Sequence, residues 1–145
     1  MIQEQVKATG YVQFVLKDAN GNIKQQENSN LIVNAGKNFL ASALLNSPTS
    51  PFTHMAIGLG SSGPSAGDTT LGSELVRQAF ATSNVTANVF TVSATYPAGT
   101  GTGALTEAGI FNNSVGGTML ARVVYSVINK GAADSLTITW TVTIS

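Results

Sequence analysis

Apolar and polar side chains alternate along most of this chain with a period of two residues. The clearest case is the C-terminal segment, residues 136–144, in which four threonines alternate with larger apolar side chains: Leu136, Ile138, Trp140, Val142 and Ile144. Successive side chains of a β-strand point to opposite faces. The segment therefore predicts a strand with one buried apolar face and one threonine face.

Further alternating runs, separated by turn residues, predict a protein of about eight strands. Asn20-Gly21 predicts a tight hairpin turn, and glycine-rich loops without periodicity occupy residues 60–70 and 97–103. The runs cover residues 11–16, 23–33, 54–59, 74–83, 85–96, 105–111, 119–128 and 136–144. Short strands at regular spacing predict an all-β fold, an antiparallel β-sandwich or jelly roll.

One segment, residues 35–46, changes to a helical period. Its apolar residues are spaced three and four positions apart, which places them on one face of a helix: Phe39, Leu40, Ala43 and Leu44. Asn34 stands where an N-cap residue belongs, and two following prolines stop a helix from continuing. We expect one short helix, inserted after the second strand.

Composition limits the possible partners. The 145 residues suffice for one domain, residues 1–145, around a single core. Seven basic and seven acidic residues cancel, and charged residues make up 10% of the chain against roughly 25% in ordinary soluble domains. Such a surface lacks the basic stripe that nucleic acid requires.

No apolar stretch approaches the roughly 20 residues of a membrane span, and no signal-peptide pattern opens the chain. We expect a protein made in the cytosol, with neither nucleic acid nor membrane as a partner.

Residues with catalytic or metal-binding chemistry are sparse and isolated. The pattern Gly58-Leu-Gly60-Ser-Ser-Gly63 matches a dinucleotide-binding fingerprint, but Pro64 follows where the helix of that motif must begin. His54 is the only histidine, cysteine is absent, and the acidic residues are scattered singly. We therefore predict no metal site, no cofactor and no catalytic residues, and expect that the chain is not an enzyme.

Two charged residues, Glu107 and Arg122, lie in otherwise apolar runs on either side of a predicted turn at residues 113–117. In a hairpin across that turn they can pair, and an unpaired charge in such a setting is costly. We predict a structural ion pair, with contact to a neighbouring subunit as the alternative for one of the two. Glu74 and Arg77 are three positions apart, so we expect them on opposite faces of a strand with separate partners.

Two blocks, Glu107-Ala-Gly-Ile-Phe111 and Met119-Leu-Ala-Arg122, precede the alternating C-terminal strand and are the most specific part of a longer succession of segments. Over most of the chain, that succession resembles small virion proteins of tailed bacteriophages. The resemblance implies a structural rather than an enzymatic protein. Jelly-roll cement or decoration proteins, which lie over major capsid subunits, are the closest functional type.

We therefore expect a capsid cement protein that resides in the virion, associates with itself as a dimer or trimer, and binds junctions between major capsid proteins. Its contacts are expected on exposed loops, the N-terminal segment and the threonine face. The candidate interface residues are Met1, Ile2, Gln3, Ser61, Ser62, Pro64, Thr100, Thr102, Thr139 and Thr141. Residues 123–128 are uncharged and β-prone, so we expect them centrally in a sheet or covered by another chain.

Two other functions stay open. A tail-fibre or baseplate-associated protein, including a receptor-binding module, has the same style of sequence. A lectin-like module would bind carbohydrate on aromatic platforms, for which Tyr11, Tyr96, Tyr125 and Trp140 are available, although each falls in a strand pattern typical of core or sheet face. Copy number per particle separates the shell from the tail.

Overall fold

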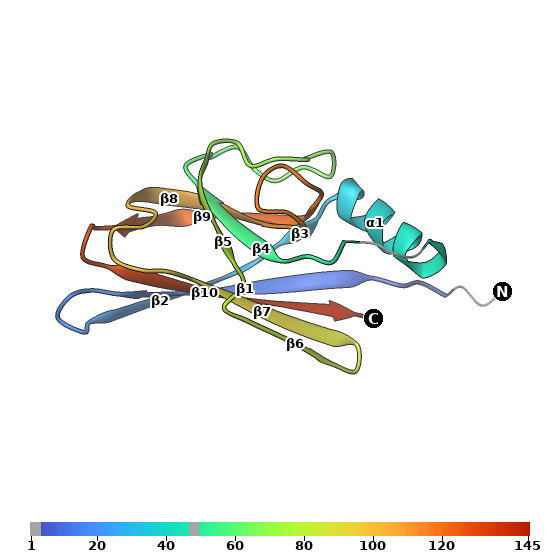
Figure 1. The fold of residues 1–145 in the computed structure, drawn as a ribbon, viewed down its shortest axis with the longest axis horizontal. Helices are drawn as coiled ribbons and strands as arrows, with labels where there is room; N and C mark the ends of the chain where they lie inside the picture. The colour runs from blue at the N-terminus through green and yellow to red at the C-terminus, as the bar shows by residue number, and fades with distance from the viewer. Residues whose placement is uncertain (1–3, 47–49) are drawn as a thin grey trace.

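A computed structural model describes residues 4–46 and 50–145 of the chain. Within these residues, two antiparallel five-stranded sheets pack face to face, and a single helix lies at one end of them (Figure 1). The predicted all-β sandwich with one inserted helix is confirmed. Because each sheet has one face against the other, the alternation seen in the sequence becomes an inner apolar face and an outer face.

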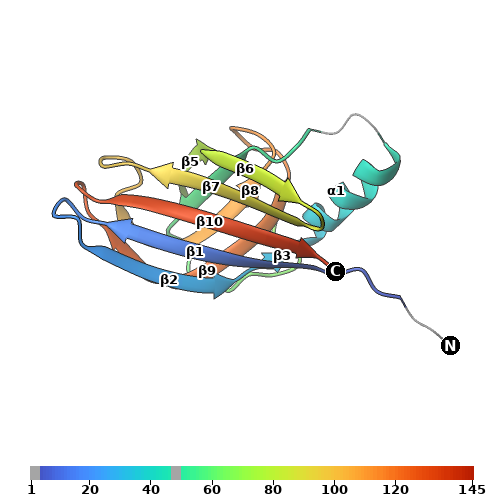
Figure 2. The ribbon, with the colours of Figure 1, turned by 90° about the horizontal axis from the view of Figure 1, so that it is seen from below.

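The first sheet, called sheet A, is seen face-on in Figure 2. Its strands in spatial order are β2 (Ile23–Ser29), β1 (Ala8–Lys17), β10 (Ser135–Ile144), β7 (Val89–Tyr96) and β6 (Thr82–Thr86). The second, sheet B, contains in order β3 (Leu31–Ile32), β9 (Met119–Lys130), β8 (Gly103–Phe111), β4 (His54–Gly58) and β5 (Glu74–Ala79). Hairpins alternate between the sheets: β1–β2 and β6–β7 belong to sheet A, β4–β5 and β8–β9 to sheet B.

The described residues form ten strands rather than about eight, because two predicted strands each break in two. The run at residues 23–33 divides at Asn30, and the run at residues 74–83 divides at residues 80–81. The predicted boundary at Asn84 is also wrong, because β6 continues through it to Thr86 and the turn lies at residues 87–88. At both breaks the chain passes from one sheet to the other. Period-two alternation continues across such a crossing, so the pattern alone does not reveal it.

Helix α1 spans Asn34–Leu45, one residue earlier than predicted. The predicted N-cap at Asn34 is wrong, because Val33 occupies the cap position and no side chain caps the helix. Instead, the backbone N–H of Asn34 donates to the carbonyl of Ala66 at 2.8 Å. A carbonyl from a distant loop thus satisfies a donor that a side chain usually satisfies, which ties the helix start to that loop.

The core lies between the inner faces of the sheets. β10 is the central strand of sheet A, and its Leu136, Ile138, Trp140 and Val142 are buried. Burying each such side chain contributes roughly 1.5–3 kcal/mol. Beside them in the same sheet, Tyr96 of β7 donates its hydroxyl to the carbonyl of Met55 on β4 of sheet B at 2.6 Å. The apolar face predicted for the C-terminal strand is therefore core.

The expectation that residues 123–128 lie centrally in a sheet or are covered by another chain is met in part, because β9 lies between β3 and β8 but is not paired along its whole length on the β3 side. β3 pairs only with Ala121 and Arg122, so β9 has no hydrogen-bonded strand beyond them on that side within the described residues. β2 of sheet A approaches there instead, and Gln26 Nε2 donates to the carbonyl of Ser126 at 3.2 Å. Because β3 is only two residues long, it cannot cover the whole strand.

Candidate functional site

In the described part of the chain, the most elaborate polar arrangement surrounds the carboxylate of Glu107 on β8, which is fully buried. Three backbone N–H groups donate to it: Gly72 at 2.7 Å, Ser73 at 2.8 Å, and Gly60 at a still shorter distance. All three donors belong to the β4–β5 loop, residues 59–73. Hydrogen bonds to a carboxylate are roughly twice as strong as those between neutral groups, so this carboxylate binds the loop to sheet B.

Arg122 on β9 completes this arrangement, which we call the Glu107 network. Its Nη2 lies 3.1 Å from Glu107 Oε1 and its Nη1 lies 2.9 Å from Asp68 Oδ2. Nη2 also donates to the carbonyl of Ser62 at 3.0 Å. The structure thus brings Glu107 and Arg122 together within one chain. The Arg122 side chain is buried and joins Ser62 and Asp68 of the loop to sheet B.

Glu107 and Arg122 are diagonal rather than opposite neighbours. The residue paired with Arg122 is Gly109, and the residue paired with Glu107 is Val124. A Cβ added to Gly109 would lie 3.0 Å from Leu71, the buried side chain of the loop. The glycine therefore leaves room for Leu71 of the loop to pack on the outer face of sheet B.

Two of the three glycines of the dinucleotide-like pattern, Gly58 and Gly60, have a structural explanation, whereas a Cβ on Gly63 would meet nothing within 4 Å. A Cβ on Gly58 would lie 2.9 Å from Glu107 Oε2 and 2.4 Å from the carbonyl of Ser73. One on Gly60 would lie only 2.2 Å from the same carboxylate oxygen. These positions allow backbone to approach an anion closely, which is the physical use of glycine in phosphate loops as well. Here the anion is the protein's own Glu107, and the pattern was the sequence signal for it.

The loop is also fixed by contacts outside the ion pair. Thr106 Oγ1 donates to the carbonyl of Gly60 at 2.8 Å, and the N–H of Ser65 donates to Asp68 Oδ2 at 2.8 Å. Leu71 packs in a second apolar cluster on the outer face of sheet B, with Val33, Ala56, Phe111 and Met119. These contacts hold the loop near its start at Gly60, in its middle at Asp68 and near its end at Leu71. Ser61, Ser62 and Pro64, which form its tip, stay exposed.

The prediction that Glu74 and Arg77 lie on opposite faces with separate partners is wrong, because they form a second ion pair. Arg77 Nη2 lies 2.7 Å from Glu74 Oε1, so the two residues share a face of β5. The register between β4 and β5 shifts at Ile57 and Gly58, which leaves Leu75 as an extra residue on β5. A bulge of this kind returns residues three apart to the same face. Arg77 also donates to the carbonyls of residues 113 and 116, both at 2.8 Å.

On the outer face of sheet A, β7 and β10 carry a group of hydroxyl side chains that we call the threonine face: Thr91, Ser93 and Thr95 on β7 and Thr137, Thr139, Thr141 and Thr143 on β10. Thr139 lies opposite Ser93, and Thr141 opposite Thr91. Because β10 is paired on both sides, these threonines form a sheet surface and not an edge. None of the seven side chains is charged.

The structure does not gather the predicted interface residues on one surface. Ser61, Ser62 and Pro64 are exposed on the β4–β5 loop over sheet B, whereas Thr139 and Thr141 are half-buried on the outer face of sheet A. Thr102 is exposed and Thr100 half-buried in the turn between β7 and β8. Met1, Ile2 and Gln3 lie outside the described residues. The described candidates thus fall in three separate places: the β4–β5 loop, the β7–β8 turn and the outer face of sheet A.

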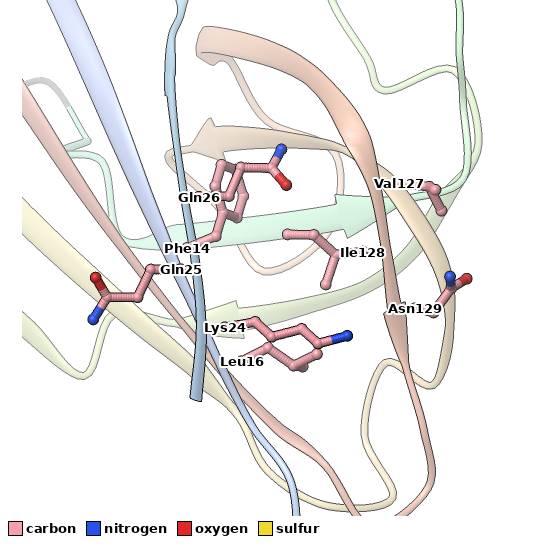
Figure 3. A pocket seen from close by; sticks show the side chains of 8 residues that line it. All are labelled: Phe14, Leu16, Lys24, Gln25, Gln26, Val127, Ile128 and Asn129. Atoms are coloured by element: carbon pink, nitrogen blue, oxygen red, sulfur yellow. The ribbon is translucent and has the colours of Figure 1, made fainter. Parts of the chain in front are cut away.

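A groove of about 420 Å³ opens between the edges of β2 and β9 (Figure 3). Phe14, Leu16 and Ile128 contribute apolar side chains to it, and Lys24 lies along it from β2. Its lining contains one charged side chain, Lys24, and no carboxylate or imidazole. The groove offers apolar packing and amide hydrogen bonds rather than acid–base chemistry. Sequence reasoning missed it, because it depends on the short length of β3.

The described residues hold no group of three or more histidine, cysteine, aspartate or glutamate side chains placed to bind a metal ion. His54 Nδ1 lies 2.7 Å from Thr53 Oγ1. Tyr96, Tyr125 and Trp140 are buried, so among the four aromatic residues considered for sugar binding Tyr11 alone is substantially exposed, at 45%. No helix in the described part of the chain is long and apolar enough to cross a membrane.

Comparisons of the chain with protein-family models, with curated proteins and with solved structures found no match.

Proposed function

We propose that this protein is a non-enzymatic structural component of a bacteriophage particle, of the capsid cement or decoration type. In this proposal its β4–β5 loop binds junctions between major capsid proteins. The observation that carries the proposal is the Glu107 network, which holds the β4–β5 loop against sheet B while the uncharged residues Ser61, Ser62 and Pro64 stay exposed. We propose a binding role and not a catalytic one, because the charged groups of the network bond to one another and to the loop backbone.

The blocks that resemble phage virion proteins are the ones that build the network. Residues 107–111 form part of β8 and supply Glu107, while residues 119–122 open β9 and supply Arg122. Gly109, which belongs to the first block and pairs with Arg122, gives the loop room to pack. The residues that carry the resemblance are therefore the same residues that fix the loop, which supports a role for the loop in binding.

A fixed loop favours binding because little conformational freedom is lost when a partner docks. Ser61, Ser62 and Pro64 at its tip are exposed and uncharged, so we expect recognition through shape and backbone hydrogen bonds, with weak dependence on salt. An interface of standard size buries about 800 Å² per partner. Many weak interfaces repeated over a shell stabilise it through multivalency.

The first test is quantitative mass spectrometry and cryo-electron microscopy of purified particles of the virus that encodes the chain. The expected result is hundreds of copies over the shell. A dozen copies or fewer, found only at the tail, would favour the tail-fibre or baseplate function instead. Particles without the protein would overturn both virion functions.

The second test uses the loop itself. Pro64→Arg places a bulky charge at the loop tip and is expected to reduce binding to shells at least tenfold. Ala19→Arg, in the exposed turn between β1 and β2, is the matched control and is expected to bind like the wild type. Equal binding by both variants would show that the β4–β5 loop is not the contact.

A further inference from the structure

β6 is an unusual edge strand. Among the four edges in the described part of the chain, β2 carries Lys24 and Glu27, β5 carries Glu74 and Arg77, and β3 is two residues long. Charged side chains and very short edges both oppose pairing with another chain. β6 reads Thr-Ser-Asn-Val-Thr, and all five residues are exposed. It has no charge, no proline and no such protection.

The backbone of β6 is arranged to pair with a copy of itself. A two-residue turn at 87–88 joins β6 to β7, so Thr86 and Val89 are the hydrogen-bonded pair that closes the hairpin. Hydrogen-bonded and non-bonded pairs alternate along an antiparallel ladder. Asn84 therefore also bonds toward β7, whereas Ser83 and Val85 direct their N–H and C=O groups toward the free edge.

We propose that two copies of this chain join through β6 in an antiparallel, twofold-symmetric pair centred on Asn84. In that register Ser83 of each copy faces Val85 of the other, and all four outward-directed N–H groups find a carbonyl. Even-numbered residues stay on one face and odd-numbered residues on the other, as the pleat requires. The same surface serves both partners, so the contact closes at a dimer.

The side chains fit the same register. Val85 is 75% exposed, and a groove of about 290 Å³ beside β6 is lined by apolar side chains of Phe52, Phe80, Phe90 and Val92. Ser83 also lines that groove. Since Val85 of the partner lies beside Ser83, it comes over the groove. On the other face Thr82 meets Thr86 of the second copy, a favourable cross-strand pair.

The interface between the two β6 strands is small, so a low affinity is expected. One five-residue edge and one valine per copy bury less than the about 1,200 Å² in total that marks stable interfaces. The dimer is therefore expected to be weak, with a dissociation constant that is micromolar or higher, so that it forms only at high protein concentration. It joins two copies of sheet A into one continuous sheet, which doubles the threonine face. This inference does not depend on the proposed function, because the pairing is measured in solution.

The register is tested by cross-linking, since the chain contains no cysteine. In a non-bonded pair the two Cα atoms are about 4.5 Å apart, which suits a disulfide. Asn84→Cys is therefore expected to oxidise to a covalent dimer at least ten times faster than Thr82→Cys, whose two copies would be about 13 Å apart. Equal rates, or no cross-linking of Asn84→Cys, would overturn the register.

The surface is tested by sedimentation equilibrium up to about 1 mM. Val85→Lys and Ser83→Pro, which removes an outward N–H at an edge where proline is tolerated, are expected to weaken dimerisation at least tenfold. Val115→Lys, at a valine that is 82% exposed in the turn between β8 and β9, is the matched control and is expected to dimerise like the wild type. Circular dichroism checks folding of each variant. A wild type that stays monomeric, a trimer, or unchanged dimerisation by both Val85→Lys and Ser83→Pro would refute the proposal.

Discussion

At the scale of single residues, Glu107 and Arg122 matter most for stability, because removing either one leaves the charge of the other buried without its partner. Glu107 accepts three backbone N–H groups besides Arg122. In many proteins a buried ion pair can be replaced by apolar residues at little cost. Here the replacement would also leave the three loop N–H groups unpaired, each at about 1–3 kcal/mol.

Arg122→Met is expected to lower the free energy of unfolding by about 3–5 kcal/mol, because it leaves an uncompensated buried carboxylate. The double variant Glu107→Leu with Arg122→Met is expected to remain destabilised, since the loop N–H groups stay unpaired. Urea unfolding followed by fluorescence of the single tryptophan measures both. Glu74→Gln, at a partly exposed pair, is the control and is expected to cost under about 1 kcal/mol. A double variant as stable as the wild type would contradict this account.

Because of two buried tyrosines, the free energy of unfolding is expected to change with pH in the alkaline range. Burial raises the pKa of Tyr96 and of Tyr125, and the nearby Glu107 carboxylate raises that of Tyr125 further. A group whose pKa is raised by folding contributes stability that is fully present below its unfolded pKa, about 10, and is lost as the pH rises above it. Lys130 acts in the opposite sense, because burial lowers its pKa.

Stability is therefore expected to fall steeply above about pH 10. Tyr125→Phe is expected to flatten that fall, at the cost of the hydrogen bond to the carbonyl of Glu107 at neutral pH. Urea midpoints measured from pH 8 to pH 11.5 provide the comparison, and Lys130 contributes equally to both proteins. Identical pH profiles for the two would show that Tyr125 does not titrate with unfolding.

At the scale of elements, the sequence predicted strands well and their partners poorly. The alternation in residues 136–144 was sufficient to identify β10 and its buried face, because period two is a local property. The crossings at Asn30 and at residues 80–81 depend on which sheet each half joins, which the local pattern does not encode. The bulge at Leu75 misled the assignment of Glu74 and Arg77 for the same reason. The loop donors to Glu107 come from 34 to 47 residues away in sequence, beyond the reach of pattern.

The threonine face gives a prediction about β10. Thr139→Lys and Thr141→Lys are each expected to change the free energy of unfolding by less than about 1 kcal/mol, because a lysine can extend from this outer face into water. If the face contacts another subunit, assembly onto particles is expected to weaken at least tenfold. Unchanged assembly with both lysines would assign the face to solvent and leave the β4–β5 loop as the contact.

At the scale of the whole molecule, the two sides of the sandwich differ in kind. Sheet B is covered by the β4–β5 loop, which buries charge and apolar surface beneath it, while sheet A presents its outer threonines openly. β6 lies at the edge of the open sheet. The proposed contacts divide in the same way: the loop face toward the shell and the β6 edge toward a second copy.

The central place of β10 in sheet A has a consequence for how the chain folds during synthesis. β1 and β7 are both made long before the strand that must lie between them. Sheet A therefore cannot close until residues 135–144 have left the ribosome, and pairings this distant in sequence are slow to form. Nascent chains stalled before residue 135 are expected to be digested rapidly by protease, and chains stalled about 40 residues beyond the end, through a linker, to resist it.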